Sequence, residues 1–242
     1  MKSVKTLTRR AFLRQSTMAA GALSVSPLVM SRAFGDANPS DKITVGAIGI
    51  AGRGRYILNA FLQYSDVKVV AVCDVFADRR NRAKQMVDEH YGNDDCAAYI
   101  DARELIARPD IDAVMIATGD NNHAPLSILA ARAGKDIYCE KPMSVTIAES
   151  RAVSDAVRHN GRIFQCGTQR RNVGNFVLAV ELARSGALGE IQTVYAEKAW
   201  PDSNIYYGVL PEEPLPPYEE MAWDLWLGPA AWRPYNLKYT TG

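Results

Sequence analysis

The sequence lacks the patterns that identify several classes of protein. The one extended apolar stretch near its start, residues 18–30, is short and polar for a stable membrane span, because Gly21, Ser24, Ser26 and Pro27 interrupt it. Its four cysteines show no C-x-x-C spacing, and no cluster of His, Cys, Asp or Glu has the spacing of a metal site. We therefore expect no metal centre and no disulfide, with three of the thiols packed as small apolar groups in buried strands.

The sequence also lacks a strong excess of charge. Its 28 basic and 27 acidic residues nearly cancel, but six of the basic residues and no acidic residue fall within the first 35 positions. The rest of the chain holds 22 basic and 27 acidic residues and is mildly acidic. This balance argues against nucleic acid as the main partner.

The basic start of the chain is typical of an export signal. Residues 8–14 read Thr-Arg-Arg-Ala-Phe-Leu-Arg, a twin-arginine pattern, and the weakly apolar stretch follows it. We therefore expect residues 1–35 to be a twin-arginine signal that engages the export machinery and takes the protein to the periplasm or otherwise out of the cytoplasm. A basic disordered tail and an uncleaved membrane anchor are the alternatives.

A glycine-rich turn organises the rest of the chain. Residues 43–54 begin as an apolar β-strand and run into this turn, and residues 55–64 have the apolar spacing of a helix. A strand, a glycine turn and a helix together form a phosphate cradle, because backbone N–H groups and the positive end of the helix both face an anion.

The spacing of this turn nearly matches the dinucleotide-binding fingerprint G-x-G-x-x-G. Gly49, Ala51 and Gly54 occupy the three glycine positions, and Gly52 can restore the close approach that the methyl group of Ala51 hinders. Asp74 ends the next apolar run, where a carboxylate can bind a ribose hydroxyl. The alternative is an ordinary glycine-rich connection with a solvated acid.

Strands and helices then alternate with short connections up to Gly167. Apolar runs at 112–117, 136–139 and 162–166 predict strands, and helical spacing between them includes a capping box at Thr146 and Glu149. This order predicts an α/β fold, a doubly wound parallel Rossmann sheet over residues 36–167, with its ligand crevice at the carboxyl ends of the strands.

The pattern changes after Gly167. A helix over 175–184 and a long alternating strand over 190–200 are predicted, followed by a proline-rich loop. One helix and one strand cannot close a sheet, so we expect residues 168–242 to be the start of an α+β domain with an open antiparallel sheet, incomplete within this chain.

Three motifs follow the last three strands of the series. They are Ala117-Thr118-Gly119 through His123, then Glu140-Lys141-Pro142, and then Gly-Thr-Gln-Arg-Arg at 167–171. Together they strongly resemble the Gfo/Idh/MocA family of NAD(P)-dependent oxidoreductases over about residues 42–240. The closest likeness is to its twin-arginine branch, which includes glucose–fructose oxidoreductase and shares the Trp-Asp-Leu-Trp-Leu-Gly-Pro segment at 223–229.

The resemblance implies a role for each matching residue. Lys141 matches the lysine that lies beside the nicotinamide and the substrate hydroxyl, where an ammonium would stabilise an alkoxide as hydride leaves. His123 is either close to the cofactor or structural at a helix start. The predicted cofactor-binding residues are Gly49, Ala51, Gly52, Arg53, Gly54, Asp74, Thr118, Gly119, His123, Glu140, Lys141 and Gln169.

The implied activity is hydride transfer between NAD or NADP and a hydroxyl carbon of a sugar, a polyol or a related compound. Asp74 favours NAD, because a carboxylate repels a 2′-phosphate, while Arg79 and Arg80 make NADP possible. The resemblance also implies a homo-oligomer when the protein is full length. An NAD-dependent glycoside hydrolase of the same family is the second reading.

Two departures from the family pattern bear on this reading. Gly119 replaces the usual proline after the third strand, and the family's catalytic Asp and His of the second domain would fall beyond Gly242. The second departure raises a third reading, a non-catalytic nucleotide-binding fragment.

Overall fold

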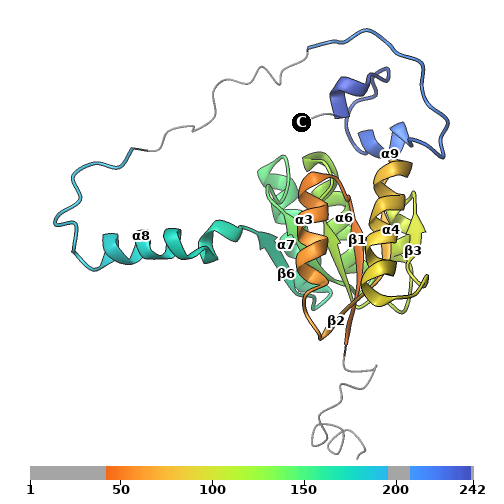
Figure 1. Ribbon diagram of the computed structural model, residues 1–242. Helices are drawn as coiled ribbons and strands as arrows, with labels where there is room; N and C mark the ends of the chain where they lie inside the picture. Colours follow the sequence, from red (N-terminus) through yellow and green to blue (C-terminus); the bar gives the residue numbers. More distant parts are fainter. Residues whose placement is uncertain (1–41, 196–207, 241–242) are drawn as a thin grey trace, which may run out of the picture. The chain divides into compact units, whose positions relative to one another are not determined.

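The computed structural model describes residues 42–195 and 208–240 of the 242-residue chain. Its centre is a six-stranded sheet in the order β3-β2-β1-β4-β5-β6, in which every neighbouring pair of strands is parallel. Crossover helices connect the strands and cover the sheet (Figure 1). This is the doubly wound Rossmann arrangement that the alternation of strands and helices predicts.

The strands are short, and the central ones are largely buried, as their apolar runs require. β1 and β4 at the middle of the sheet keep alternate residues on opposite faces, so that Val45 and Met115 join one core and Ile48 and Ile116 join the other. The bounds are β1 Ile43–Ile48, β2 Val67–Cys73, β3 Ala97–Tyr99, β4 Ala113–Ile116, β5 Asp136–Glu140 and β6 Phe164–Gly167. The three-residue β3 lies in the short apolar run at 96–100 and is not among the strands predicted from the sequence.

Helices pack on both faces of the sheet and separate the core into two layers. One apolar cluster combines the strands with α3 (Gly52–Phe61) and α4 (Ala77–Tyr91) through residues such as Leu58 and Val87. The other includes residues of α5 (Ala102–Ile106), α6 (Asp120–Arg132) and α7 (Ile147–His159). The predicted capping box of α7 is confirmed, because the Thr146 hydroxyl accepts from the Glu149 amide and the Glu149 carboxylate accepts from the Thr146 amide.

Two helices begin earlier than the apolar spacing indicates. α3 begins at Gly52 and not at Arg55, and it ends at Phe61, so Tyr64 lies outside it and is exposed. α6 begins at Asp120, although apolar spacing predicts a helix only from about Ala124 to Ala133. In both cases the first turn is glycine-rich or polar and carries no apolar signal, although it forms the part of the helix nearest the carboxyl edge of the sheet.

The residues after β6 form short helices. These are the 3₁₀ helix η3 (Gln169–Asn172), α8 (Gly174–Arg184), α9 (Trp223–Leu227) and the 3₁₀ helix η4 (Leu237–Thr240). α8 buries none of its residues. The strand predicted over 190–200 is wrong for residues 190–195, which form no strand, and residues 196–200 lie outside the described part of the chain.

The four cysteines are free thiols, and burial differs among them. Cys73 and Cys139 are fully buried in β2 and β5, Cys96 is buried just before β3, and Cys166 in β6 is partly exposed. Burial raises the pKa of the Cys96 and Cys139 thiols to about 12, which suits their use as apolar packing groups.

Among the described residues, no helix is long and apolar enough to cross a membrane.

Candidate functional site

The turn between β1 and α3 depends on two glycines. Gly49 has φ +82°, and a Cβ there would lie 2.7 Å from the backbone of Ala117 and Thr118. A Cβ at Gly54 would lie 1.8 Å from the carbonyl oxygen of Gly49. Both positions therefore require glycine, since the turn, the start of α3 and the end of β4 approach one another through bare backbone.

The N-terminus of α3 is left open to an external anion. Its N-cap residue, Ala51, makes no side-chain hydrogen bond to the helix, and its first turn holds no acidic residue. A Cβ at Gly52 would meet no protein atom within 4 Å, so this glycine faces open space. Exposed amides and the positive end of a ten-residue helix fit the pyrophosphate of a dinucleotide.

Asp74 follows β2 and is buried, with 6% of its surface exposed. Its Oδ2 accepts a 2.6 Å hydrogen bond from the Ile50 amide in the glycine turn, and its Oδ1 accepts one of 2.9 Å from the Phe76 amide. Burial raises the pKa of this carboxyl group above its usual value, while the two amides oppose the shift. Asp74 therefore also fixes the glycine turn, a contact that the sequence does not indicate.

A cleft of about 760 Å³ opens at the carboxyl edge of the sheet. It brings together five of the predicted cofactor residues: Gly49, Ala51, Asp74, Thr118 and Gly119. It also takes in residues 100–103 after β3 and seven residues between Asp224 and Thr240, none of which was predicted to line the site. The residues between Asp224 and Thr240 include part of the Trp-Asp-Leu-Trp-Leu-Gly-Pro segment, which in the sequence indicates only a likeness to the family.

A second group of predicted residues meets at Glu140, the last residue of β5. This buried carboxylate accepts from Arg53 Nε at 2.8 Å, from the Lys141 amide at 3.0 Å and from the Gln169 side-chain amide. Gln169 Nε2 also donates to the Tyr138 hydroxyl at 2.8 Å. Glu140 thus joins the first turn of α3 to the segments that follow β5 and β6.

His123 joins two loops of the same edge. It is 1% exposed, and its Nδ1 and Nε2 lie 2.6 Å from the Pro142 carbonyl oxygen and 3.2 Å from the Thr118 carbonyl oxygen. Both partners are carbonyl oxygens, which only accept, so each contact is a hydrogen bond when the ring nitrogen that makes it carries a proton. Its hydrogen-bond partners are backbone groups of the loops after β4 and β5, and it does not line the cleft.

Lys141 lies between these two arrangements. Glu140 holds its amide, and its carbonyl group begins a cis peptide bond to Pro142, whose own carbonyl contacts His123. The Lys141 side chain is exposed and is not part of the cleft. The structure therefore positions the backbone of Lys141 firmly and leaves its ammonium group toward solvent.

The two arginines that would allow NADP differ in their contacts. Arg80 is buried and donates to the carbonyl oxygens of Asp74 and Glu219, at 2.8 and 3.1 Å. Arg79 lines the cleft, with its guanidinium 4.0 Å from the centre of the Phe76 ring. Of the two, only Arg79 is placed to meet a 2′-phosphate.

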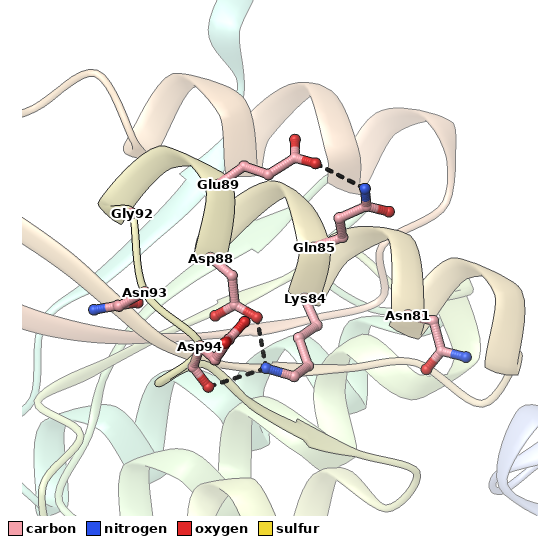
Figure 2. A pocket seen from close by; sticks show the side chains of 8 residues that line it. All are labelled: Asn81, Lys84, Gln85, Asp88, Glu89, Gly92, Asn93 and Asp94. Atoms are coloured by element: carbon pink, nitrogen blue, oxygen red, sulfur yellow. Dashed lines mark hydrogen bonds and ion pairs between the residues drawn. The ribbon is translucent and has the colours of Figure 1, made fainter.

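A second hollow, of about 650 Å³, lies along α4 and the turn after it (Figure 2). Its side chains pair with one another: Lys84 with Asp88 at 2.5 Å, and Gln85 with Glu89 at 2.7 Å. Since α4 runs back from the carboxyl edge, its last turn lies toward the amino edge, away from the predicted site residues. Among the described residues, no group of His, Cys, Asp or Glu could hold a metal ion.

The chain is similar in sequence to known proteins that include dehydrogenases. The chain is 33% identical over 150 residues to the inositol 2-dehydrogenase of Salmonella typhimurium, covering 61% of this chain and 43% of that protein. It is 29% identical over 208 residues to a glycosyl hydrolase family 109 protein of Saccharopolyspora erythraea, covering 76% of this chain and 44% of that protein. The chain thus spans less than half the length of these relatives.

The fold and the family agree with these matches. A crystal structure of a probable dehydrogenase from Thermotoga maritima matches with a TM-score of 0.54 and 30% identity, over 60% of this chain and 42% of the other. The model of the Gfo/Idh/MocA oxidoreductase family with an NAD-binding Rossmann fold matches residues 43–168. Strand order, glycine turn and sequence therefore lead to one conclusion: the chain belongs to the Gfo/Idh/MocA family of oxidoreductases.

Proposed function

We propose that the protein is an NAD(P)-dependent oxidoreductase that acts on a hydroxyl group of a polyol or sugar. The observation that carries this proposal is the carboxyl edge itself: the uncapped N-terminus of α3 at Ala51, the obligatory glycine Gly49 and the buried carboxylate of Asp74 meet around one cleft. The inositol 2-dehydrogenases among the relatives support a polyol as the substrate.

Different residues along this edge have different proposed roles. The turn at Gly49–Gly54 holds the pyrophosphate, and Asp74 accepts from a ribose hydroxyl while it fixes Ile50. The bound nicotinamide would exchange the hydride with the substrate carbon. Lys141 places a positive charge beside the substrate oxygen, where negative charge develops as the hydride leaves.

The cofactor proposal is tested by titrating the purified chain with NAD and with NADP in a calorimeter. We expect both to bind, with NAD the tighter, because Asp74 repels a 2′-phosphate and Arg79 is the one cation of the Arg79–Arg80 pair free to compensate. Absence of binding of either nucleotide would overturn the proposal. Reduction of NAD in the presence of inositols or other polyols tests the substrate class.

An NAD-dependent glycoside hydrolase is the second candidate. It is favoured by one observation: the match to the glycosyl hydrolase family 109 protein covers 76% of this chain, more than the match to the Salmonella dehydrogenase. Release of free sugar from a glycoside without net formation of NADH would select this reading over the dehydrogenase. Nucleotide binding with neither reaction would select a nucleotide-binding role.

The location and assembly of the protein are further proposals. From Arg9 and Arg10, which lie outside the described residues, we infer export by the twin-arginine route. We also infer a Rossmann domain that ends near residue 167 and a homo-oligomer for the full-length protein. Replacing both arginines with lysine should keep a tagged protein in the cytoplasm. Recovery of this variant in the periplasm would contradict the export proposal.

A further inference from the structure

Residues 221–240, here called the capping segment, attach to the connection between β2 and α4. Met221 forms an isolated antiparallel bridge with Phe76, the Ala222 amide donates to the Val75 carbonyl at 3.2 Å, and the Ala77 amide donates to the Glu220 carbonyl just before the segment at 2.9 Å. The segment is therefore paired, backbone to backbone, with the residues that directly follow Asp74.

The capping segment has an apolar core of its own at this attachment. Phe76, Met221, Trp223, Leu227 and Tyr235 form a buried cluster, and the Trp223 indole donates to the Arg233 carbonyl at 2.8 Å. Trp223 and Trp226 stack with their ring centres 4.7 Å apart and 8° between their planes. This packing holds Trp226 in a defined position.

The same segment also attaches to the first turn of α6, which begins after β4. Asn121 Nδ2 donates to the Leu227 carbonyl at 2.6 Å, and Asn122 Nδ2 donates to the Trp226 carbonyl at 3.2 Å. The capping segment thus reaches from the end of β2 to the end of β4. It crosses the carboxyl edge of the sheet at the position of β1, which lies between these two strands.

The consequence is that the capping segment forms part of the cleft. Trp226, Pro229 and Tyr239 line it together with Asp74 and Ala102. No lining residue comes from the connections that directly follow β5 and β6, so this cleft belongs to the β3-β2-β1-β4 side of the edge. In a Rossmann sheet the acidic residue after β2 marks the adenosine side of the dinucleotide.

We propose that the capping segment is the outer wall of the adenosine site and that Trp226 contacts the adenine base. A half-buried indole, already stacked on Trp223 on one face, offers an apolar surface to a base, and stacking of bases on aromatic rings strengthens binding in other proteins. The inference rests on the proposed nucleotide binding and adds a determinant outside the Rossmann motif.

The test compares two tryptophan variants of the whole chain, with ADP-ribose as the probe because it carries the adenosine and pyrophosphate without nicotinamide. Trp226→Ala should lower the affinity for ADP-ribose about tenfold or more, and it should remove most of the quenching of tryptophan fluorescence on binding. The control is Trp232→Ala in the same segment, since Trp232 is 76% exposed and outside the cleft.

A second measurement guards against a folding defect in Trp226→Ala. Hydrogen exchange in the unmodified protein should slow in residues 221–228 when ADP-ribose is added, and Asn121→Ala, which releases the Leu227 carbonyl without removing a cleft residue, should weaken this protection. If the unmodified protein binds ADP-ribose but Trp226→Ala binds equally well, or exchange in 221–228 is unchanged, the capping-segment proposal is wrong. If the unmodified protein binds no nucleotide, the proposed function fails with it.

Discussion

The two ends of the sheet's carboxyl edge differ in how completely this chain builds them. At the β3-β2-β1-β4 end, the glycine turn, Asp74 and the capping segment surround a cleft from several sides. At the β5-β6 end, Glu140 and His123 fix the backbone around Lys141, but the lysine side chain is exposed and outside that cleft. The proposed binding surface and the proposed reacting group are therefore spatially separate in this protein, and variants can address them one at a time.

The largest effect should come from the glycine turn. Gly54→Ala places a methyl group 1.8 Å from the Gly49 carbonyl oxygen, and relief of that clash would separate α3 from β1 at a cost of about 3 kcal/mol or more. The measurement is the free energy of unfolding in urea.

Gly52→Ala is the matched control for the turn, because its methyl group meets no protein atom. We expect it to fold as the unmodified protein does and to bind ADP-ribose roughly tenfold more weakly, since we propose that the pyrophosphate approaches through the open space at Gly52. A Gly54→Ala protein as stable as Gly52→Ala would contradict the packing described for this turn.

The next largest effect should be on the rate of the proposed reaction and not on nucleotide binding. Lys141→Met should lower the rate of polyol oxidation by about 10² or more while leaving the affinity for ADP-ribose unchanged, because the lysine does not line the cleft that we propose for adenosine. Calorimetry and the rate of NADH formation, measured on one preparation, check both halves of the prediction. A parallel loss of ADP-ribose affinity would show that the two ends are not separable.

Asp74→Asn should weaken nucleotide binding by about tenfold. The asparagine side chain has one oxygen that can accept from the backbone N–H of Ile50 or Phe76, and its NH₂ group then faces the other N–H, which needs an acceptor. Asp78→Asn, an exposed position one turn further along the chain, is the control.

Burial raises the pKa of Asp74, so protonation begins at a higher pH than in the unfolded chain. Nucleotide binding by the unmodified protein should therefore decline on acidification before ordinary aspartates titrate. An affinity independent of pH down to 4 would argue against a carboxylate role.

The smallest effect should come from the opposite edge of the sheet. Asp112 accepts from the Thr44 hydroxyl and amide at 2.6 and 2.8 Å, and these hydrogen bonds hold its pKa below the usual value. Its contribution to stability is therefore complete above the unfolded pKa of about 3.9 and is lost as pH falls through the lower folded pKa.

Because Asp112 is exposed, we expect Asp112→Ala to cost only about 0.5 kcal/mol at pH 7, and less near pH 3. Affinity for ADP-ribose should not change. Thermal unfolding at the two pH values checks the prediction, and a constant difference between them would exclude the carboxylate as its source.

Much of this architecture follows from local sequence. Four of the five parallel pairings join strands with clear apolar runs, the capping box of α7 is a pattern of two residues, and Gly49, Gly54 and Asp74 are recognisable by spacing. These features are readable because each depends on residues within about one β-α-β unit. The strand over 190–195 was mispredicted because alternation alone does not supply a neighbouring strand.

The sequence by itself determined that a parallel sheet would carry a phosphate-binding turn and an acid at one edge, because backbone geometry and strand burial impose those residues locally. Only the tertiary structure decided that Glu140 would gather Arg53, Lys141 and Gln169, and that Trp226 would line the same cleft as Asp74 across some 150 positions of chain. Contacts between distant segments depend on how helices and loops pack on the sheet, and no local periodicity records that packing.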